Sequence, residues 1–263
     1  MLWMYLIPTW LLGVLIVGTS VVLSVLGLYL LEPFIRRHPH PGNDIVYSFA
    51  AGVGVIYALV LGLFAVATWD SLKAADDTAS KEALQVSKLY LDLSGYPKAD
   101  RDHLRPLLRQ YLSHVIKVEW PVQQKGQDPK DPAFIAEMMD YWMKVEPVTE
   151  GQKIVHTEAM QQLNELLSLR RARQANVHAA LPTPLWAVVI LGAIVNIAMC
   201  FLISSDKGVL HSAMVALFAA MIGVMIFVIV AVDHPMWGDV SVSPESYVQV
   251  LNRLSSESAS LGR

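Results

Sequence analysis

Charged residues are missing from four long stretches of the chain, each rich in Leu, Ile, Val, Ala and Gly. A helix needs about 20 apolar residues to cross the roughly 30 Å of hydrocarbon in a bilayer, and each stretch meets that length. The pattern predicts transmembrane helices at about 9–31, 45–69, 185–203 and 209–232. The first stretch is longer than the apolar part of a secretory signal, and no Lys or Arg precedes it. We therefore expect it to remain as an anchor.

Four spans divide the chain into a first hairpin at 1–69, a helical domain outside the bilayer at 70–182, a second hairpin at 183–232 and a tail at 233–263. The predicted fold class is all-α. An even number of spans puts the domain and both termini on one side of the membrane. Near the spans that side carries five cations and the short loops carry three, which favours the cytoplasm. These cations are Lys73, Lys81, Arg170, Arg171 and Arg173 on the domain side, and Arg36, Arg37 and Lys207 in the loops.

The domain between the hairpins shows helical periodicity. From Leu72 to Leu93 apolar residues recur every three or four positions, and Glu82 is the one polar member of that stripe. Because neither Gly nor Pro occurs between Gly62 and Gly95, this helix is expected to continue the second span without a break. A further helix is expected to stop at Pro121.

Composition agrees with a membrane protein and excludes several functions. Hydrophobic residues make up 54% and charged residues 16% of the chain, against about 25% charged in soluble domains. The net charge of −3 gives no electrostatic basis for binding nucleic acid. Cys200 is the sole cysteine, which rules out an intramolecular disulfide and a cysteine-based metal cluster. Without HExxH, GxSxG or a phosphate-binding glycine loop, we expect no enzyme activity, cofactor or metal.

The second span carries small residues at four-residue spacing, namely Ala50, Gly54, Ala58 and Gly62. In lipid, such a face lets helix backbones approach closely. Two interpretations stay open: packing against another span of the same chain, or packing against a neighbouring copy in an oligomer. In the second case the opposite side of the helix would face a shared axis, where apolar and aromatic rings can gate a pore by dewetting.

The spans contain no Asp, Glu, Lys or Arg, which argues against an ion-coupled pump and leaves a passive pore possible. Asn196 is the one strongly polar side chain well inside the spans and is expected to donate a hydrogen bond between helices. Acidic residues where the second span ends can form a ring that favours cations at a pore mouth; these candidates are Asp70, Asp76 and Asp77. The pore-lining candidates are Tyr57, Val60, Leu61, Phe64 and Thr68.

Three stretches carry a family resemblance. They are Tyr57, Gly62, Trp69 and Asp70 of the second span, the segment from Tyr111 to Pro121 that closes in Val118-Glu119-Trp120-Pro121, and the sequence Asp233-His234-Pro235-Met236-Trp237-Gly238-Asp239-Val240 with Val242 and Pro244. Together they resemble the bestrophin-like domain family of bacterial membrane proteins, and span nearly the whole chain. That family is remotely similar to the bestrophins, which are homopentameric ion channels with a pore lined by the second span.

The resemblance implies a homo-oligomer, with a pentamer favoured, in the bacterial inner membrane, with lipid and inorganic ions as its other partners. Two bestrophin features are missing from the sequence: the apolar neck with regular aromatic rings, and an acidic calcium clasp in the tail. Calcium gating and anion selectivity are therefore not carried over. The alternative function is a non-conducting membrane sensor or scaffold whose helical domain binds a partner.

Overall fold

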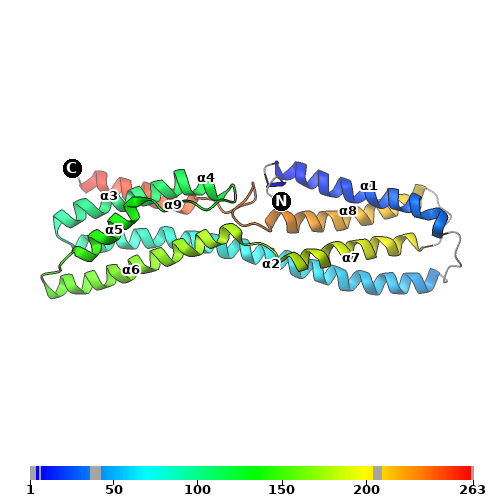
Figure 1. Ribbon diagram of the computed structural model, residues 1–263, viewed down its shortest axis with the longest axis horizontal. Helices are drawn as coiled ribbons and strands as arrows, with labels where there is room; N and C mark the ends of the chain where they lie inside the picture. Colours follow the sequence, from blue (N-terminus) through cyan, green and yellow to red (C-terminus); the bar gives the residue numbers. More distant parts are fainter. Residues whose placement is uncertain (1–3, 6, 36–42, 204–208, 262–263) are drawn as a thin grey trace. The chain divides into compact units, whose positions relative to one another are not determined.

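The computed structural model describes residues 4–5, 7–35, 43–203 and 209–261, and every regular element in those ranges is helical (Figure 1). The stretches Thr9–Leu31, Asp44–Gly95, Glu150–Phe201 and Val209–Val232 each contain a helical segment long and apolar enough to cross a membrane. The prediction of an all-α membrane protein with four spans is confirmed. Arg36, Arg37 and Lys207, used in the orientation argument, lie outside the described residues.

The helices follow one another with short connections. The α-helices are α1 (Thr9–Ile35), α2 (Asn43–Asp92), α3 (Lys98–His114), α4 (Trp120–Gln123), α5 (Ala133–Lys144), α6 (Glu150–Ala175), α7 (Thr183–Phe201), α8 (Val209–Val232) and α9 (Glu245–Leu261). Between the α-helices lie two 3-10 turns, η2 (Leu93–Gly95) and η4 (Asn176–His178), and a π-helix, η3 (Val115–Glu119). The expected unbroken helix is confirmed, since α2 runs over 50 residues.

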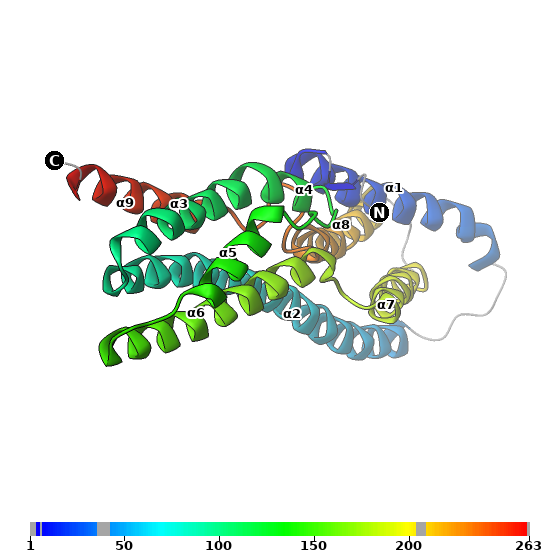
Figure 2. The same cartoon turned by 60° about the vertical axis from the view of Figure 1, so that its left-hand side comes forward.

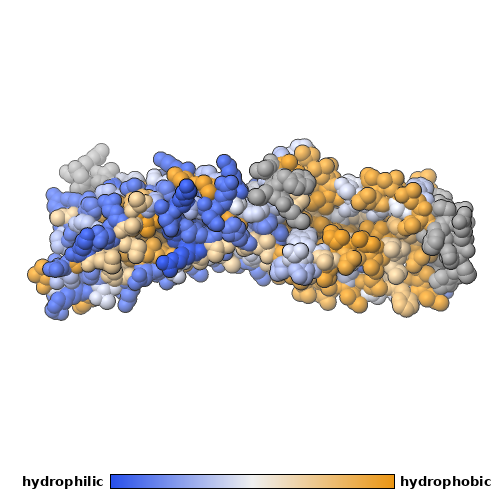
Figure 3. Space-filling model, in the orientation of Figure 1, coloured by the Kyte–Doolittle hydropathy of each residue, from blue (hydrophilic) through white to orange (hydrophobic). Residues whose placement is uncertain are grey.

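The chain divides into two compact units. Unit 1 comprises Met1–Ser71, Ala180–His234 and Gly238–Val240. Unit 2 comprises Leu72–Ala179, Pro235–Trp237 and Ser241–Arg263. The helix α2 contributes its first part to unit 1 and its last part to unit 2. On the face drawn in Figure 3, unit 1 is mostly apolar and unit 2 mostly hydrophilic.

In unit 1, α1 lies along α8, as both ribbon views show (Figures 1 and 2). Gly223 of α8 permits this approach, because a Cβ atom there would lie only 3.1 Å from the Cα atom of Val17. Asp239 accepts hydrogen bonds from the backbone N–H and the hydroxyl of Thr9 at 3.1 and 3.2 Å. A carboxylate in this place satisfies a free N–H group at the start of α1.

In unit 2, the last part of α2 packs with α3, α5, α6 and α9 around large buried side chains, among them Leu89, Leu104, Leu108, Tyr111, Trp120, Met138, Trp142 and Tyr247. A capping box begins α6: the Thr149 hydroxyl accepts the N–H of Gln152, and the Gln152 side chain accepts the N–H of Thr149. The core is therefore built from amphipathic helices, as the apolar periodicity predicts.

The helix expected to stop at Pro121 does not stop there. It passes through η3 and continues as α4 to Gln123. Pro121 has no N–H to donate to the carbonyl of Lys117, so the ordinary α-helical pattern is interrupted at this point. A π-helix accommodates the interruption by inserting an extra residue into the turn. As a result Glu119 and Trp120 both lie in the core of unit 2.

Candidate functional site

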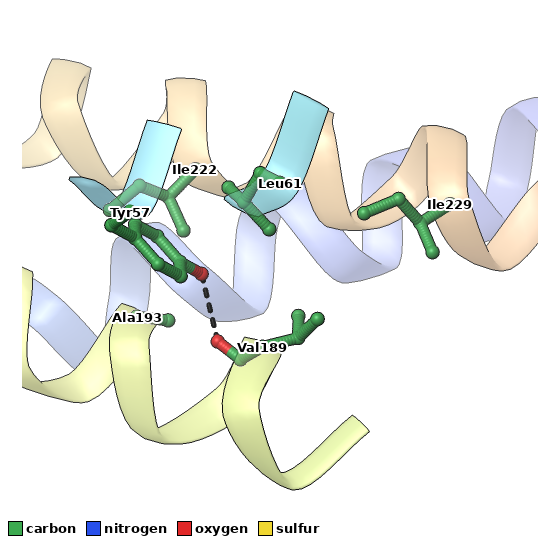
Figure 4. Close-up of a cluster of buried hydrophobic side chains, with 6 residues drawn as sticks. All are labelled: Tyr57, Leu61, Val189, Ala193, Ile222 and Ile229. Atoms are coloured by element: carbon green, nitrogen blue, oxygen red, sulfur yellow. Dashed lines mark hydrogen bonds between the residues drawn. The ribbon is translucent and has the colours of Figure 1, made fainter. Parts of the chain in front are cut away.

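Tyr57 of α2 belongs to a buried cluster that joins α2, α7 and α8 (Figure 4). Its hydroxyl donates a hydrogen bond of 2.8 Å to the carbonyl of Val189. Gly192 makes room for the ring, because a Cβ atom at this position would lie 2.4 Å from two ring atoms of Tyr57. The other members of this Tyr57 cluster are Leu61, Ala193, Ile222 and Ile229.

Three of the five pore-lining candidates are buried in the protomer: Tyr57, Leu61 and Thr68 are 7%, 3% and 4% exposed. The Thr68 hydroxyl donates to the carbonyl of Phe64 in its own helix at 3.1 Å. Val60 and Phe64 are partly exposed, and Phe64 packs against the Tyr57 cluster. A side chain covered by its own chain offers no surface to a shared axis, which argues against a pore role for the three buried residues.

The opposite side of α2 carries an exposed stripe, which we call the outward face of α2. Its apolar members are 58% to 70% exposed. Beyond them, Asp70 and Asp77 follow Leu63 at intervals of seven residues, which keeps all three on one side of a helix. Asp76 lies on another side. The apolar members of this face are Val55, Ile56, Leu59, Leu63 and Val66.

The three acidic pore-mouth candidates, Asp70, Asp76 and Asp77, are exposed on α2. Within the described part of the chain, none of them takes part in an ion pair. Their charges are therefore available to solvent or to a passing ion.

The small-residue face of α2 makes little close contact inside the protomer. A Cβ atom at Gly62 would meet nothing within 4 Å, and one at Gly54 would meet the Oδ1 atom of Asn196 at 3.5 Å. Ala58 is exposed and Ala50 is partly buried. Among the described helices, the close approach that small residues allow occurs between α1 and α8. The space beside Ala58 and Gly62 thus remains open to another molecule.

Two arginines of α6 hold two glutamates in the interior of unit 2. Arg173 donates from Nε to Oε2 of Glu82 at 2.8 Å and from Nη2 to Oε1 at 3.1 Å. Its Nη2 atom also donates to Glu119 at 2.7 Å, and Arg170 donates to the other oxygen of Glu119 at 2.6 Å. Arg170 further reaches Asp131 at 2.7 Å. The side chains of Glu82, Glu119 and Arg173 are fully buried. We call these five residues the ion-pair cluster.

Neutral partners satisfy further atoms of the ion-pair cluster. Gln123 accepts a hydrogen bond from Arg173 at 2.6 Å, and the Tyr111 hydroxyl donates to Glu82 at 2.5 Å. Burial by itself lowers the pKa of Arg173, but the charge and hydrogen bond of Glu82, together with Tyr247 and Tyr111, outweigh this, so the pKa lies well above its usual range. Burial and then Glu82 raise the pKa of Tyr111. The cluster therefore holds a charged guanidinium and a neutral phenol.

Sequence reasoning noted Glu82, Glu119, Arg170 and Arg173 separately and did not connect them. The signal that connects them is a carboxylate in an otherwise apolar stripe, because a buried charge needs a partner of opposite sign. Arg170 and Arg173 occupy one side of α6 at three-residue spacing, which suits that role.

Asp233, in the third stretch of the family resemblance, follows the end of α8. Its Oδ1 atom accepts the N–H of Leu181 at 2.7 Å, which ties the segment before α7 to the end of α8. Burial raises the pKa of this carboxyl, even though the Leu181 N–H, His234 and Trp186 act in the opposite direction. Nearby, the Tyr5 hydroxyl donates to the carbonyl of Val230 at 2.9 Å. This part of the motif has a structural role in unit 1.

Among the described residues, no group of three or more His, Cys, Asp or Glu side chains is arranged to hold a metal ion. The ion-pair cluster is closed by its own arginines. Its two glutamates and Arg173 are fully buried, and their charges are paired with one another.

Four apolar helices with uncharged interiors, together with a helical unit inserted between the two helix pairs, define an integral membrane protein. The model of the Bestrophin-like domain matches residues 18–247. The chain therefore belongs to the bestrophin-like domain family, which confirms the resemblance found in the sequence. No curated protein matches the chain at the level of sequence.

Solved structures share the fold. Two mutant crystal structures of a bacterial bestrophin homolog from Klebsiella pneumoniae match with TM-scores of 0.66 and 0.64 at 10% and 11% identity. In both comparisons 92% of this chain and 97% of the other are covered. At such low identity the likeness shows the fold alone.

Proposed function

We propose that the protein forms a homo-oligomeric channel, a pentamer, through which ions pass passively along an axis lined by α2. The observation that carries this proposal is the outward face of α2, which is exposed along the membrane segment and acquires carboxylates beyond it. Membership of the bestrophin-like domain family adds support. We further propose the bacterial inner membrane as its location, with unit 2 and both termini in the cytoplasm.

Within this proposal, Val55, Leu59 and Leu63 line the narrow part of the pore instead of Tyr57, Leu61 and Thr68. Their four-residue spacing keeps them along one side of the helix, and each is exposed on the protomer. Rings of such apolar side chains restrict ion flow by expelling water. Val60 and Phe64 stand at the edge of this surface.

Asp70 and Asp77 follow on the same side of α2 and form acidic rings at the mouth of the proposed pore. Rings of carboxylates favour cations, so we propose a preference for cations over anions. Asp76 contributes less, because it lies on a different side of the helix.

Assembly uses the small-residue face in this proposal. Ala50, Gly54, Ala58 and Gly62 lie beside the outward face, and the open space at Gly62 suits the close approach of a neighbouring copy. Lipid covers the remaining apolar surface of unit 1.

Ion flux through liposomes that contain the purified protein tests the proposal, together with the mass of the intact assembly. The proposal predicts passive flux and a pentamer. A folded twofold dimer without flux would overturn it and favour the non-conducting sensor or scaffold.

A further inference from the structure

An apolar groove with a volume of about 330 Å³ opens between α2, α7 and α8 in unit 1. Gly54 and Ala58 form its side on α2, and Phe218, Met221 and Met225 form its side on α8. Methionine side chains are flexible and polarizable, so they adapt to ligands of varied shape. The groove is distinct from the outward face of α2 and from the ion-pair cluster, and it shares Gly54 and Ala58 with the small-residue face.

A hydrogen-bond acceptor on a largely buried side chain lines this groove. Asn196 of α7 is only 3% exposed, and its Nδ2 atom donates to the carbonyl of Gly192 at 2.9 Å. Because that carbonyl can only accept, the amide nitrogen must face it, and the Oδ1 atom is left as an acceptor. No group in the described part of the chain donates to Oδ1. The absence of a side chain at Gly54 leaves space beside that atom.

We infer that the groove binds a membrane-soluble alcohol, with its alkyl chain against Met221, Met225 and Phe218 and its hydroxyl donating to Asn196 Oδ1. An acceptor without a hydrogen-bond partner in apolar surroundings favours an apolar ligand that carries one hydrogen-bond donor. The volume lies near the lower end of the roughly 300–1,000 Å³ of ligand sites. A helix, about 10 Å across, would cover the groove as a roof and would not enter it. Binding of the alcohol in this groove does not depend on whether the protein conducts ions.

Photolabelling with a diazirine derivative of octanol, on the protein in lipid nanodiscs, tests this inference. Adducts mapped by peptide mass spectrometry are expected on the segment of α8 that contains Met221 and Met225. Ala58→Phe fills the groove from an exposed position and, in a sample whose assembly has the same mass as the wild-type protein, should reduce these adducts about tenfold or more, the effect of losing a binding site. Leu191→Phe, on the exposed side of α7, is the matched control and should leave them unchanged. Adducts spread equally over α8 and the exposed segment around Leu191 would overturn the inference.

Competition in the wild-type protein keeps the test independent of any one variant. Unlabelled octanol should displace the label several-fold better than nonane, which has the same number of heavy atoms and no hydroxyl. Asn196→Leu should remove this preference. Equal competition by octanol and nonane in the wild-type protein would contradict the inference. Labelling that occurs only in dissociated monomers would also contradict it, because a second copy would then fill the groove.

Discussion

Glu82 of α2 and Arg173 of α6 form a two-point ion pair, with both side chains completely shielded from solvent and 91 residues apart in the sequence. Such a pair fixes the facing sides of two helices, because a guanidinium and a carboxylate meet in one plane. Arg173 also holds Glu119, the last residue of the π-helix η3. The arginine thus connects three segments of unit 2.

Arg173→Met should destabilise unit 2 strongly. It leaves Glu82 and Glu119 buried without their shared cation, and the loss of one partner of a buried pair costs about 3–5 kcal/mol. Thermal unfolding in detergent measures the effect. Arg171→Met, on an exposed position of the same helix, is the control and should change stability by no more than about 0.5 kcal/mol. Equal melting temperatures for the two variants would contradict a structural role for the cluster.

Gly192→Ala should destabilise unit 1. The new methyl group would lie 2.4 Å from the ring of Tyr57, and overpacking of this kind costs about 1–3 kcal/mol. Gly18→Ala is the control, since a Cβ atom there meets nothing within 4 Å. Unfolding in mixed detergents compares the two variants. The double variant Gly192→Ala/Tyr57→Ala lacks the clash and should therefore be less destabilised than the sum of the two single variants. If the destabilisations of the single variants simply added in the double variant, this packing would be contradicted.

Asp233 should make stability depend on pH. Burial raises the pKa of its carboxyl in the folded protein, so its stabilising contribution is complete below the unfolded pKa of about 4 and is lost as pH rises through the folded pKa. Asp233→Asn copies the protonated form and can still accept the N–H of Leu181. The melting temperature of this variant relative to the wild-type protein should therefore increase from pH 4 to pH 8.

The control for this pH experiment is Asp77→Asn, which removes the same charge from an exposed side chain. Its melting curve should follow that of the wild-type protein across the range. If the melting temperature of the wild-type protein relative to that of Asp233→Asn instead increased with pH, the assigned direction of the pKa shift would be incorrect.

Asp70→Asn and Asp77→Asn should each lower the permeability ratio of cations to anions, because they remove a carboxylate from the proposed acidic rings. Reversal potentials in a salt gradient measure the ratio. Asp76→Asn, one residue away and on another side of α2, should have the smaller effect. If Asp76→Asn had the larger effect, the pore axis would lie on a different side of α2 from the one proposed.

Much of the fold follows from local pattern. The four spans and the unbroken helix from Asn43 are readable because span length and the absence of Gly and Pro are properties of contiguous residues. The end of the helix before Pro121 was not predicted correctly. Continuation through the π-helix depends on the burial of Glu119 against Arg170 and Arg173, which lie about 50 residues further along the chain.

Which residues of α2 are buried and which are exposed was harder to predict than the fold. Every side of the membrane part of α2 is apolar, so periodicity cannot distinguish Tyr57 and Leu61, which pack inward, from Leu59 and Leu63, which are exposed. The small residues of α2 indicate a surface for close helix packing, but they do not identify the helix that packs there. The inward position of Tyr57 depends on the space at Gly192, in a different span.

The central claim is that the outward face of α2 lines an ion-conducting axis, and single-channel recording in planar bilayers tests it most directly. We predict ohmic currents for the wild-type protein. Leu63→Ser should increase conductance by lowering the dewetting barrier, whereas Leu191→Ser, on an exposed part of α7, should not. If the folded protein passed no current in any salt, or the two variants conducted alike, the account would be contradicted.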